Sequence, residues 1–283
     1  MKVWAVSVGE QAGKLGEVRE GSCFVHSAFR RALNISADGE LFTVCRRGLG
    51  RSATVIVIME DLDFMTQVAP GSPVWIEQGA VRVGSLEIDV SMAAVWRGRM
   101  NENIQADISS ESVAILKSVL DRRAAPGSAW RLLQSGDSFC DAVDELIRDG
   151  SLRKLIGRGV GLTPSGDDFV LGYMAAVNHI SALRPRLVPL HEAVSASLKA
   201  TNDISAAMLK QAMRYGYHEY LDDLCHVLLN GEEERLAASA ARLTEIGATS
   251  GSDMLTGVYM AAGTYSPPTE GWRVAPGWSL ADA

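Results

Sequence analysis

The chain has 283 residues, of which 47% are apolar and 22% charged, and its formal net charge is −7 at pH 7. These values are typical of a globular protein with one or two domains. The negative charge argues against nucleic acid or an anionic membrane as a partner, although a local basic spot occurs at Arg46, Arg47 and Arg51. No run approaches the ~20 apolar residues that cross a bilayer.

The cysteines and the N-terminus indicate the compartment. The four cysteines are far apart and contain no Cys-x-x-Cys pair, which is typical of reduced thiols. The apolar run at residues 3–8 is too short for a signal peptide. We therefore expect a cytoplasmic protein.

Residues 1–98 are predicted to form a β-rich domain. Short apolar runs separated by Gly and Pro turns are typical of a small barrel or sandwich. The hairpin signal Ala37-Asp38-Gly39-Glu40 lies between candidate strands at 29–35 and 41–46. The β-branched run at 53–59 predicts a buried strand. Further strands are expected at 3–8, 74–76, 80–83 and 86–90.

Residues 108–283 are predicted to form a larger, all-helical domain, so the expected fold class is α+β. The polar residues 97–107 are expected to be a linker, and the Pro- and Trp-rich last twenty residues a loose or docked tail. Ser109 is a candidate cap for the first helix. Helical stripes occur at 113–120 and 142–147, and helical patterns at 167–183, 187–199, 203–215, 218–229, 232–246 and 253–263.

One segment of the helical region is unusual in composition: Gly157-Arg158-Gly159-Val160-Gly161-Leu162-Thr163-Pro164-Ser165-Gly166-Asp167-Asp168-Phe169. Its alternate glycines permit backbone conformations that other residues avoid, and two carboxylates follow at the start of an apolar run. The pattern recurs 85 positions later (250 − 165 = 85), where Ser165, Gly166, Asp168 and Gly172 are matched by Ser250, Gly251, Asp253 and Gly257.

The repeated pattern has a purely structural interpretation and several functional ones. Both copies fit the [ST]-x-x-[DE] capping box, which only starts a helix. A cap does not require the preceding glycines or the second acid, Asp167. The carboxylates could instead hold a divalent cation such as Mg²⁺, or orient an amide or ammonium group. Alternatively, N–H groups with the Thr163 and Ser165 hydroxyls could bind a phosphate or carboxylate, with Arg158 supplying positive charge.

The helices that follow the two turns are predicted to be buried and to pack together. Residues 169–177 and 254–262 are apolar nearly all round, which is typical of central helices. Gly172 and Gly257 fall one turn inside these helices, where glycine costs about 1 kcal/mol relative to alanine. Close packing at the glycines would offset this cost. Parallel packing would bring both turns into one cleft.

Other candidate motifs are weaker. Residues 9–15 have P-loop-like glycines but the wrong spacing and no Ser or Thr for magnesium, and 157–161 does not fit a dinucleotide fingerprint. His218, Asp222 and His226 could share one helical stripe, but this stripe lies opposite the apolar face, so we predict a solvated surface. His26, near the end of a candidate strand beside Ser27, could be catalytic or a satisfied core histidine.

The octapeptide Gly-Leu-Thr-Pro-Ser-Gly-Asp-Asp at 161–168 resembles the signature of a bacterial family that includes the AllH-type subunit of oxamate carbamoyltransferase. Weaker matches are His26-Ser27-Ala28-Phe29, Thr201-x-x-Ile204-Ser205 and the Ser250-Gly251-x-Asp253 turn. The resemblance implies a cytoplasmic protein of anaerobic allantoin-nitrogen breakdown. It would work in a complex with two other subunits, and the complex would interconvert oxamate and carbamoyl phosphate with oxalurate and phosphate.

The motifs of ordinary carbamoyltransferases, Ser-Thr-Arg-Thr and His-Pro-x-x, do not occur, so any catalysis would use a different fold. Carbamoyl transfer needs N–H donors for the carbonyl, an acceptor for the amide nitrogen and a cation for phosphate. We expect Asp167 and Asp168 to be catalytic, and assign no metal ligand. The expected ligand-binding residues are Gly159, Gly161, Thr163, Ser165, Gly166, Ser250, Gly251, Asp253, Arg158 and His26. The alternative is a structural or ligand-sensing subunit that binds a small acid or amide.

Overall fold

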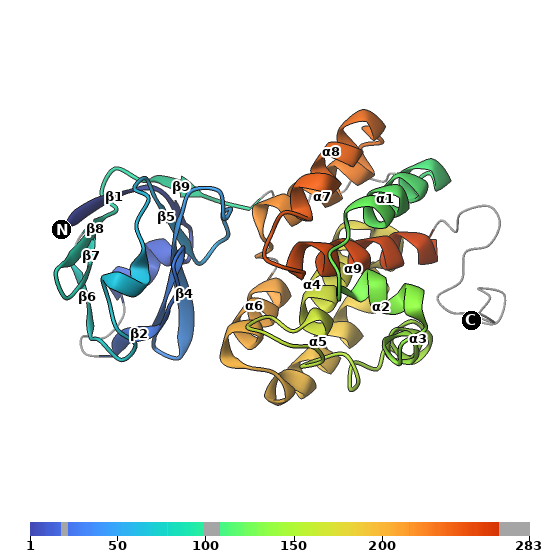
Figure 1. The fold of residues 1–283 in the computed structure, drawn as a ribbon, viewed down its shortest axis with the longest axis horizontal. Coiled ribbons are helices and arrows are strands. Elements are labelled where there is room, and N and C mark those ends of the chain that lie inside the picture. Colours follow the sequence, from blue (N-terminus) through green and yellow to red (C-terminus); the bar gives the residue numbers. More distant parts are fainter. Residues whose placement is uncertain (18–21, 78, 99–107, 215, 266–283) are drawn as a thin grey trace. The chain divides into compact units, whose positions relative to one another are not determined.

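The computed structural model of the chain describes residues 1–17, 22–77, 79–98, 108–214 and 216–265. Within these residues it divides into two compact units, drawn in Figure 1. The N-terminal unit holds residues 1–98 and 216–219, and the helical unit holds 108–214 and 220–265. The first two residues of the predicted tail, 264 and 265, belong to a helix, and the rest of the tail and all but the first two residues of the predicted linker lie outside the described residues.

The N-terminal unit is a nearly closed β barrel. Its described strands are β1 (Lys2–Gly9), β2 (Cys23–Ala28), β3 (Ala32–Ala37), β4 (Glu40–Arg46), β5 (Val55–Ile58), β6 (Val74–Glu77), β7 (Ala80–Val83), β8 (Leu86–Asp89) and β9 (Ala94–Trp96). They form one sheet in the order β2-β3-β4-β5-β1-β8-β7-β6, and β9 also pairs with β1. A bridge between Phe24 and Pro73 links the two ends of this order. Short 3-10 turns η1 (Ala12–Glu17) and η2 (Phe64–Thr66) complete the unit.

The predicted hairpin and buried strand are confirmed. Asp38 and Gly39 have φ angles of 48° and 80°, which is the left-handed conformation that a two-residue hairpin turn requires. The antiparallel strands β3 and β4 flank this turn. The run at 53–59 contains β5, which lies inside the sheet between β4 and β1. The strand β9 and the 3-10 turns η1 and η2 have no counterpart among the predicted elements.

The helical unit is built around two buried helices. Its described helices are α1 (Ser110–Arg123), α2 (Ala129–Ser135), α3 (Phe139–Asp149), α4 (Ser165–His179), α5 (Leu187–Ser197), α6 (Asp203–Met213), α7 (Glu219–Leu229), α8 (Glu233–Leu243) and α9 (Ser250–Tyr265), with 3-10 turns η3 (Ser181–Arg186) and η4 (Leu198–Ala200). Residues 165–178 of α4 and 251–263 of α9 are all buried. This confirms both predicted central helices. The short helix α2 was not predicted.

The helices α4 and α9 pack in the same direction through their glycines. A Cβ atom on Gly172 would overlap the carbonyl oxygen of Met254, and one on Gly257 would overlap that of Phe169. Close to the two N-termini, Thr163 Oγ1 and Ser250 Oγ are 2.9 Å apart. The predicted close, parallel packing is therefore confirmed, and both turns lie at one end of the helix pair.

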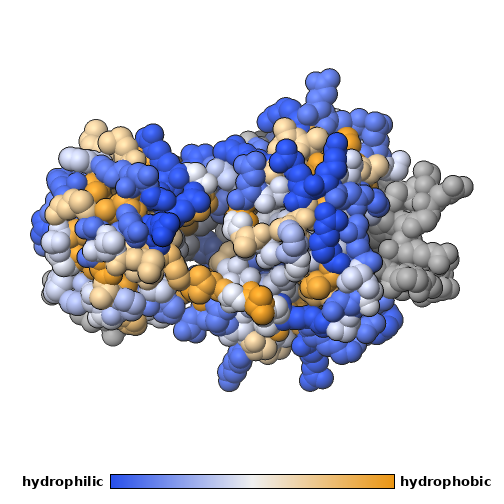
Figure 2. Space-filling view, viewed as in Figure 1, coloured by the Kyte–Doolittle hydropathy of each residue, from blue (hydrophilic) through white to orange (hydrophobic). Residues whose placement is uncertain are grey.

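The face of the molecule drawn in Figure 2 mixes hydrophilic and apolar residues, as is usual for a globular protein. On this face, hydrophilic residues cover much of both units, and apolar residues lie among the hydrophilic ones. Single exposed apolar side chains of this kind are normal. Among the described residues, no helix combines the length and the apolar character that crossing a bilayer would require.

Candidate functional site

The glycine-rich loop at 157–163 folds tightly against its neighbours. Gly157, Gly159 and Gly161 have φ angles of 79°, 122° and 97°, which L side chains rarely adopt. A Cβ atom on Gly157 would also overlap the carbonyl of Ala200, and one on Gly159 would lie 2.6 Å from the backbone nitrogen of Ser165. These glycines therefore allow close backbone contacts that position the start of α4.

The side chain of Asp167 holds this loop in place, and each of its two carboxyl oxygens accepts a hydrogen bond. Its side chain is fully buried. Oδ1 accepts a hydrogen bond from the backbone N–H of Gly157 at 2.7 Å, and Oδ2 accepts one from the hydroxyl of Thr201. The carboxylate thus ties the beginning of the loop to the segment before α6. Its contacts are those of a structural residue, which sequence reasoning did not separate from Asp168.

Asp168, the next residue, has the opposite environment. Its side chain is fully buried, and neither carboxyl oxygen has a hydrogen-bond partner among the described residues. The nearby hydroxyls of Thr163 and Ser250 bond to each other. The pKa of Asp168 is raised to about 8. Burial is the largest cause and the charges of Asp253 and Asp167 add to it, whereas the nearby Ser250 and Thr163 hydroxyls oppose it. At neutral pH its protonated form is therefore favoured.

Asp253 occupies the matching position in α9 and is half satisfied. Oδ1 accepts a hydrogen bond from the backbone N–H of Ala129 at 2.5 Å, whereas Oδ2 has no partner among the described residues. Burial raises its pKa to about 6, and the Ala129 amide and the Thr249 and Ser165 hydroxyls lower it in part. Asp253 thus holds the start of α2 and keeps one oxygen available. No sequence signal indicated the Ala129 contact.

The helix starts offer few donors to an anion. The N–H of Gly166 donates to Arg158 O at 2.8 Å, and the N–H groups of Asp167 and Asp168 donate to Pro164 O. In α9, the N–H groups of Gly251 and Asp253 donate to carbonyls of their own loop. These contacts disfavour a cradle for phosphate made from the amides of the two turns.

Arg158, which was predicted to supply positive charge for an anion, contacts other residues of the helical unit instead. The Arg158 guanidinium lies 2.9 Å from Asp137 Oδ1, bonds to Ser138 and stands over the Phe139 ring. When Asp168 is ionised, both of its oxygens and Asp253 Oδ2 are acceptors without a partner among the described residues. This arrangement suits a ligand group that donates hydrogen bonds, such as an amide. No group of three or more His, Cys, Asp or Glu side chains in the described part of the chain is arranged to hold a metal ion.

Two histidine predictions have different outcomes. His26 lies in β2 of the N-terminal unit, where Nδ1 is 3.1 Å from Ser27 Oγ, so it belongs to a different unit from the twin turns. The predicted solvated stripe is wrong for Asp222. This carboxylate is buried, and its Oδ1 lies 3.1 Å from His179 Nε2 because α4 and α7 meet there.

The fold and the acid cluster define a two-unit α+β protein, with a β barrel followed by helices around a parallel central pair. A family model described as oxamate carbamoyltransferase subunit AllH matches residues 155–262, which include both turns. A second, described as AllH family N-terminal domain, matches residues 5–95. The chain therefore belongs to the AllH family. Comparisons with curated proteins and with solved structures gave no match.

Proposed function

We propose that this chain is a subunit of a cytoplasmic carbamoyltransferase complex in allantoin-nitrogen breakdown. The complex would interconvert oxamate and carbamoyl phosphate with oxalurate and phosphate, together with other subunits. Membership of the AllH family supports the subunit role. The observation that supports a chemical role for this chain is the buried, unpartnered carboxyl group of Asp168 at the shared helix start.

Asp168 has the properties that the transfer requires of a group that accepts a hydrogen bond and a proton from the amide. The amide nitrogen of oxamate forms a bond to the carbonyl carbon of carbamoyl phosphate, loses a proton, and phosphate leaves with the electrons of the C–O bond. In its ionised form, which is the minor form at neutral pH, Asp168 would accept the hydrogen bond from the amide and take this proton. Its pKa of about 8 is close to neutrality, as suits a group that gains and loses a proton in turnover. The free Asp253 Oδ2 would accept the second amide hydrogen.

Ligand access would require movement of the loop at 157–163. Asp168 is fully buried, whereas Val160 and Leu162 in the loop are 93% and 53% exposed. The contact between Thr163 and Ser250 joins the loop to α9. Opening this contact would expose Asp168 and free both hydroxyls for the ligand.

A second candidate is a structural or ligand-sensing subunit that binds a small acid or amide without catalysis. The contacts of Asp167 and Asp253 with backbone N–H groups favour it, because they show that part of the acid cluster maintains the fold. In this case the transfer chemistry would belong to the other subunits.

The activity test uses the chain alone and in complex with its partner subunits, with phosphate-forming turnover of oxamate and carbamoyl phosphate as the readout. We expect Asp168→Asn to lower kcat of the complex by about 10²–10⁴-fold, as loss of a general acid or base does. Asp141→Asn, at an exposed position in α3, is the matched control. Full activity of an intact Asp168→Asn complex, checked by gel filtration, would favour the non-catalytic role.

A further inference from the structure

We propose that the N-terminal unit carries a separate binding pocket for a small oxyanion, a carboxylate or a phosphate, at Arg47 and Arg51. The pocket has a volume of about 310 Å³, the size of a small-molecule site. It is lined by Val6, Ser7, Arg47, Gly48, Gly50, Arg51, Val57 and Glu219. The inference does not depend on the proposed carbamoyl transfer.

The loop between β4 and β5 forms one wall and is held in place. Gly48 and Gly50 have φ angles of 87° and 85°, which turn the chain sharply. His218 Nε2 lies 2.7 Å from the carbonyl oxygen of Leu49, and the ring packs so closely that a Cβ atom on Gly50 would overlap it. The N–H of Glu219 donates to Arg51 O at 2.9 Å. Arg47 and Arg51 thus extend from a loop whose backbone is fixed by contacts with His218 and Glu219.

A β-bulge forms part of the floor. The pairing of β1 with β5 shifts register between Ala5 and Ser7, which leaves Val6 as the extra residue. Bulges redirect side chains and are frequent next to functional sites. Ser7 is buried and lines the pocket, and its hydroxyl makes no hydrogen bond with the described residues. It can therefore donate to a ligand.

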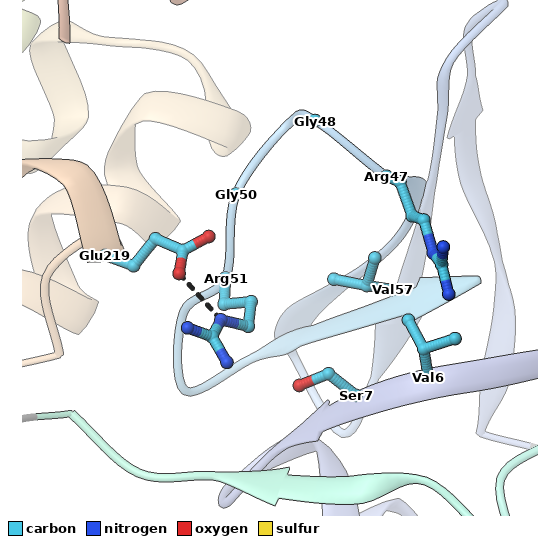
Figure 3. A pocket seen from close by; sticks show the side chains of 8 residues that line it. All are labelled: Val6, Ser7, Arg47, Gly48, Gly50, Arg51, Val57 and Glu219. Atoms are coloured by element: carbon cyan, nitrogen blue, oxygen red, sulfur yellow. Dashed lines mark hydrogen bonds and ion pairs between the residues drawn. The ribbon is translucent and has the colours of Figure 1, made fainter. Parts of the chain in front are cut away.

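The charge of the pocket favours an anion. Arg47 has no acidic partner among the described residues, whereas the neighbouring Arg46 is paired with Asp61. Arg51 uses Nε for Glu219 Oε2 at 2.6 Å, which leaves its terminal nitrogens available. Figure 3 shows Arg51 beside Glu219 on one side of the pocket and Arg47 on the other.

Two arginines and one glutamate leave a net charge of +1 in this lining (2 − 1 = +1). Guanidinium groups bind carboxylate and phosphate through paired hydrogen bonds. The site at Asp168 has an excess of acceptors, so the two sites would select ligand groups of opposite character. The pocket at Arg47 would therefore bind a ligand that the twin turns would reject.

The test is calorimetric titration of the full chain with inorganic phosphate and, separately, with acetate, at constant ionic strength. We expect saturable binding of at least one of them, weakened about tenfold or more by Arg47→Gln or Arg51→Gln, as loss of a charged hydrogen bond predicts. Glu219→Gln should tighten binding, because it removes the competing carboxylate. Arg30→Gln, which removes a charge from the exposed Arg30–Asp63 pair in the same unit, should leave it unchanged.

The outcomes separate the ligand classes and the two sites. Binding of phosphate alone would assign a phosphate pocket, and binding of acetate alone a carboxylate pocket. Retained binding in Asp168→Asn would support a site distinct from the twin turns, whatever the activity of that variant. The proposal is overturned if neither anion binds, if Asp168→Asn abolishes binding, or if Arg47→Gln and Arg30→Gln bind alike while circular dichroism shows both folded.

Discussion

At the residue scale, adjacent acids in the first turn of α4 differ in their contacts. Asp167 accepts two hydrogen bonds, from Gly157 and Thr201, whereas Asp168 accepts none from the described residues. We expect Asp167→Asn to lower the free energy of unfolding by about 1–3 kcal/mol, because it leaves a buried donor unsatisfied. Asp168→Asn should be neutral or stabilising, since it removes a buried acid without a partner. Urea unfolding at neutral pH measures both; an equal loss in the two variants would contradict this assignment.

The pH dependence of stability should report the same acid. An aspartate in the unfolded chain has a pKa of about 3.9, whereas that of folded Asp168 is about 8. The folded state therefore holds this proton more firmly, and the free energy of unfolding should fall as pH rises from about 4 to about 8. Asp253, with a pKa of about 6, adds a smaller loss of the same sign between about 4 and 6.

Asp168→Asn provides the comparison for this prediction. The variant lacks the titrating group, so its stability relative to the parent should increase as pH rises through the same window. Urea unfolding at several pH values measures the difference. A constant difference would mean that Asp168 keeps an ordinary pKa in the folded protein.

At the element scale, the contact between α4 and α9 depends on glycine. In an exposed helix, alanine in place of glycine would stabilise by up to about 1 kcal/mol. Gly172→Ala should instead destabilise by about 3 kcal/mol or more, because the added Cβ overlaps the backbone of Met254 and the helices must separate. Thermal or urea unfolding tests the sign, with Gly13→Ala as a control at a position with open space. A stabilised Gly172→Ala variant would show that the helices are not in backbone contact.

At the scale of the whole molecule, we propose that 1–98 and 108–283 are separate domains. Limited proteolysis should cut within 97–107 and leave a stable helical fragment. We further expect both fragments to co-elute in gel filtration. The reason is that residues 216–219 belong to the N-terminal unit, where His218 and Glu219 contact the loop at Leu49 and Arg51. Early cuts within 160–260, with none in the window, would contradict the boundary.

Local chemistry was enough to predict much of this fold. The turn at Asp38-Gly39 was readable because hairpin turns depend on adjacent residues. The buried helices were readable because each is apolar nearly all round, and the matched Gly172 and Gly257 predicted their close packing. The octapeptide at 161–168 was enough to indicate the AllH family.

Long-range packing decided the rest. The three-residue strand β9 exists because it pairs with β1, about ninety positions away, and no local pattern encodes such a pairing. Asp222 is buried because His179 meets it across two helices. Which of the adjacent acids at 167 and 168 lacks a partner depends on where the backbone of Gly157 and the hydroxyl of Thr201 lie. The environment of a carboxylate is set by groups that only the folded chain brings near, so residue type and spacing could not assign it.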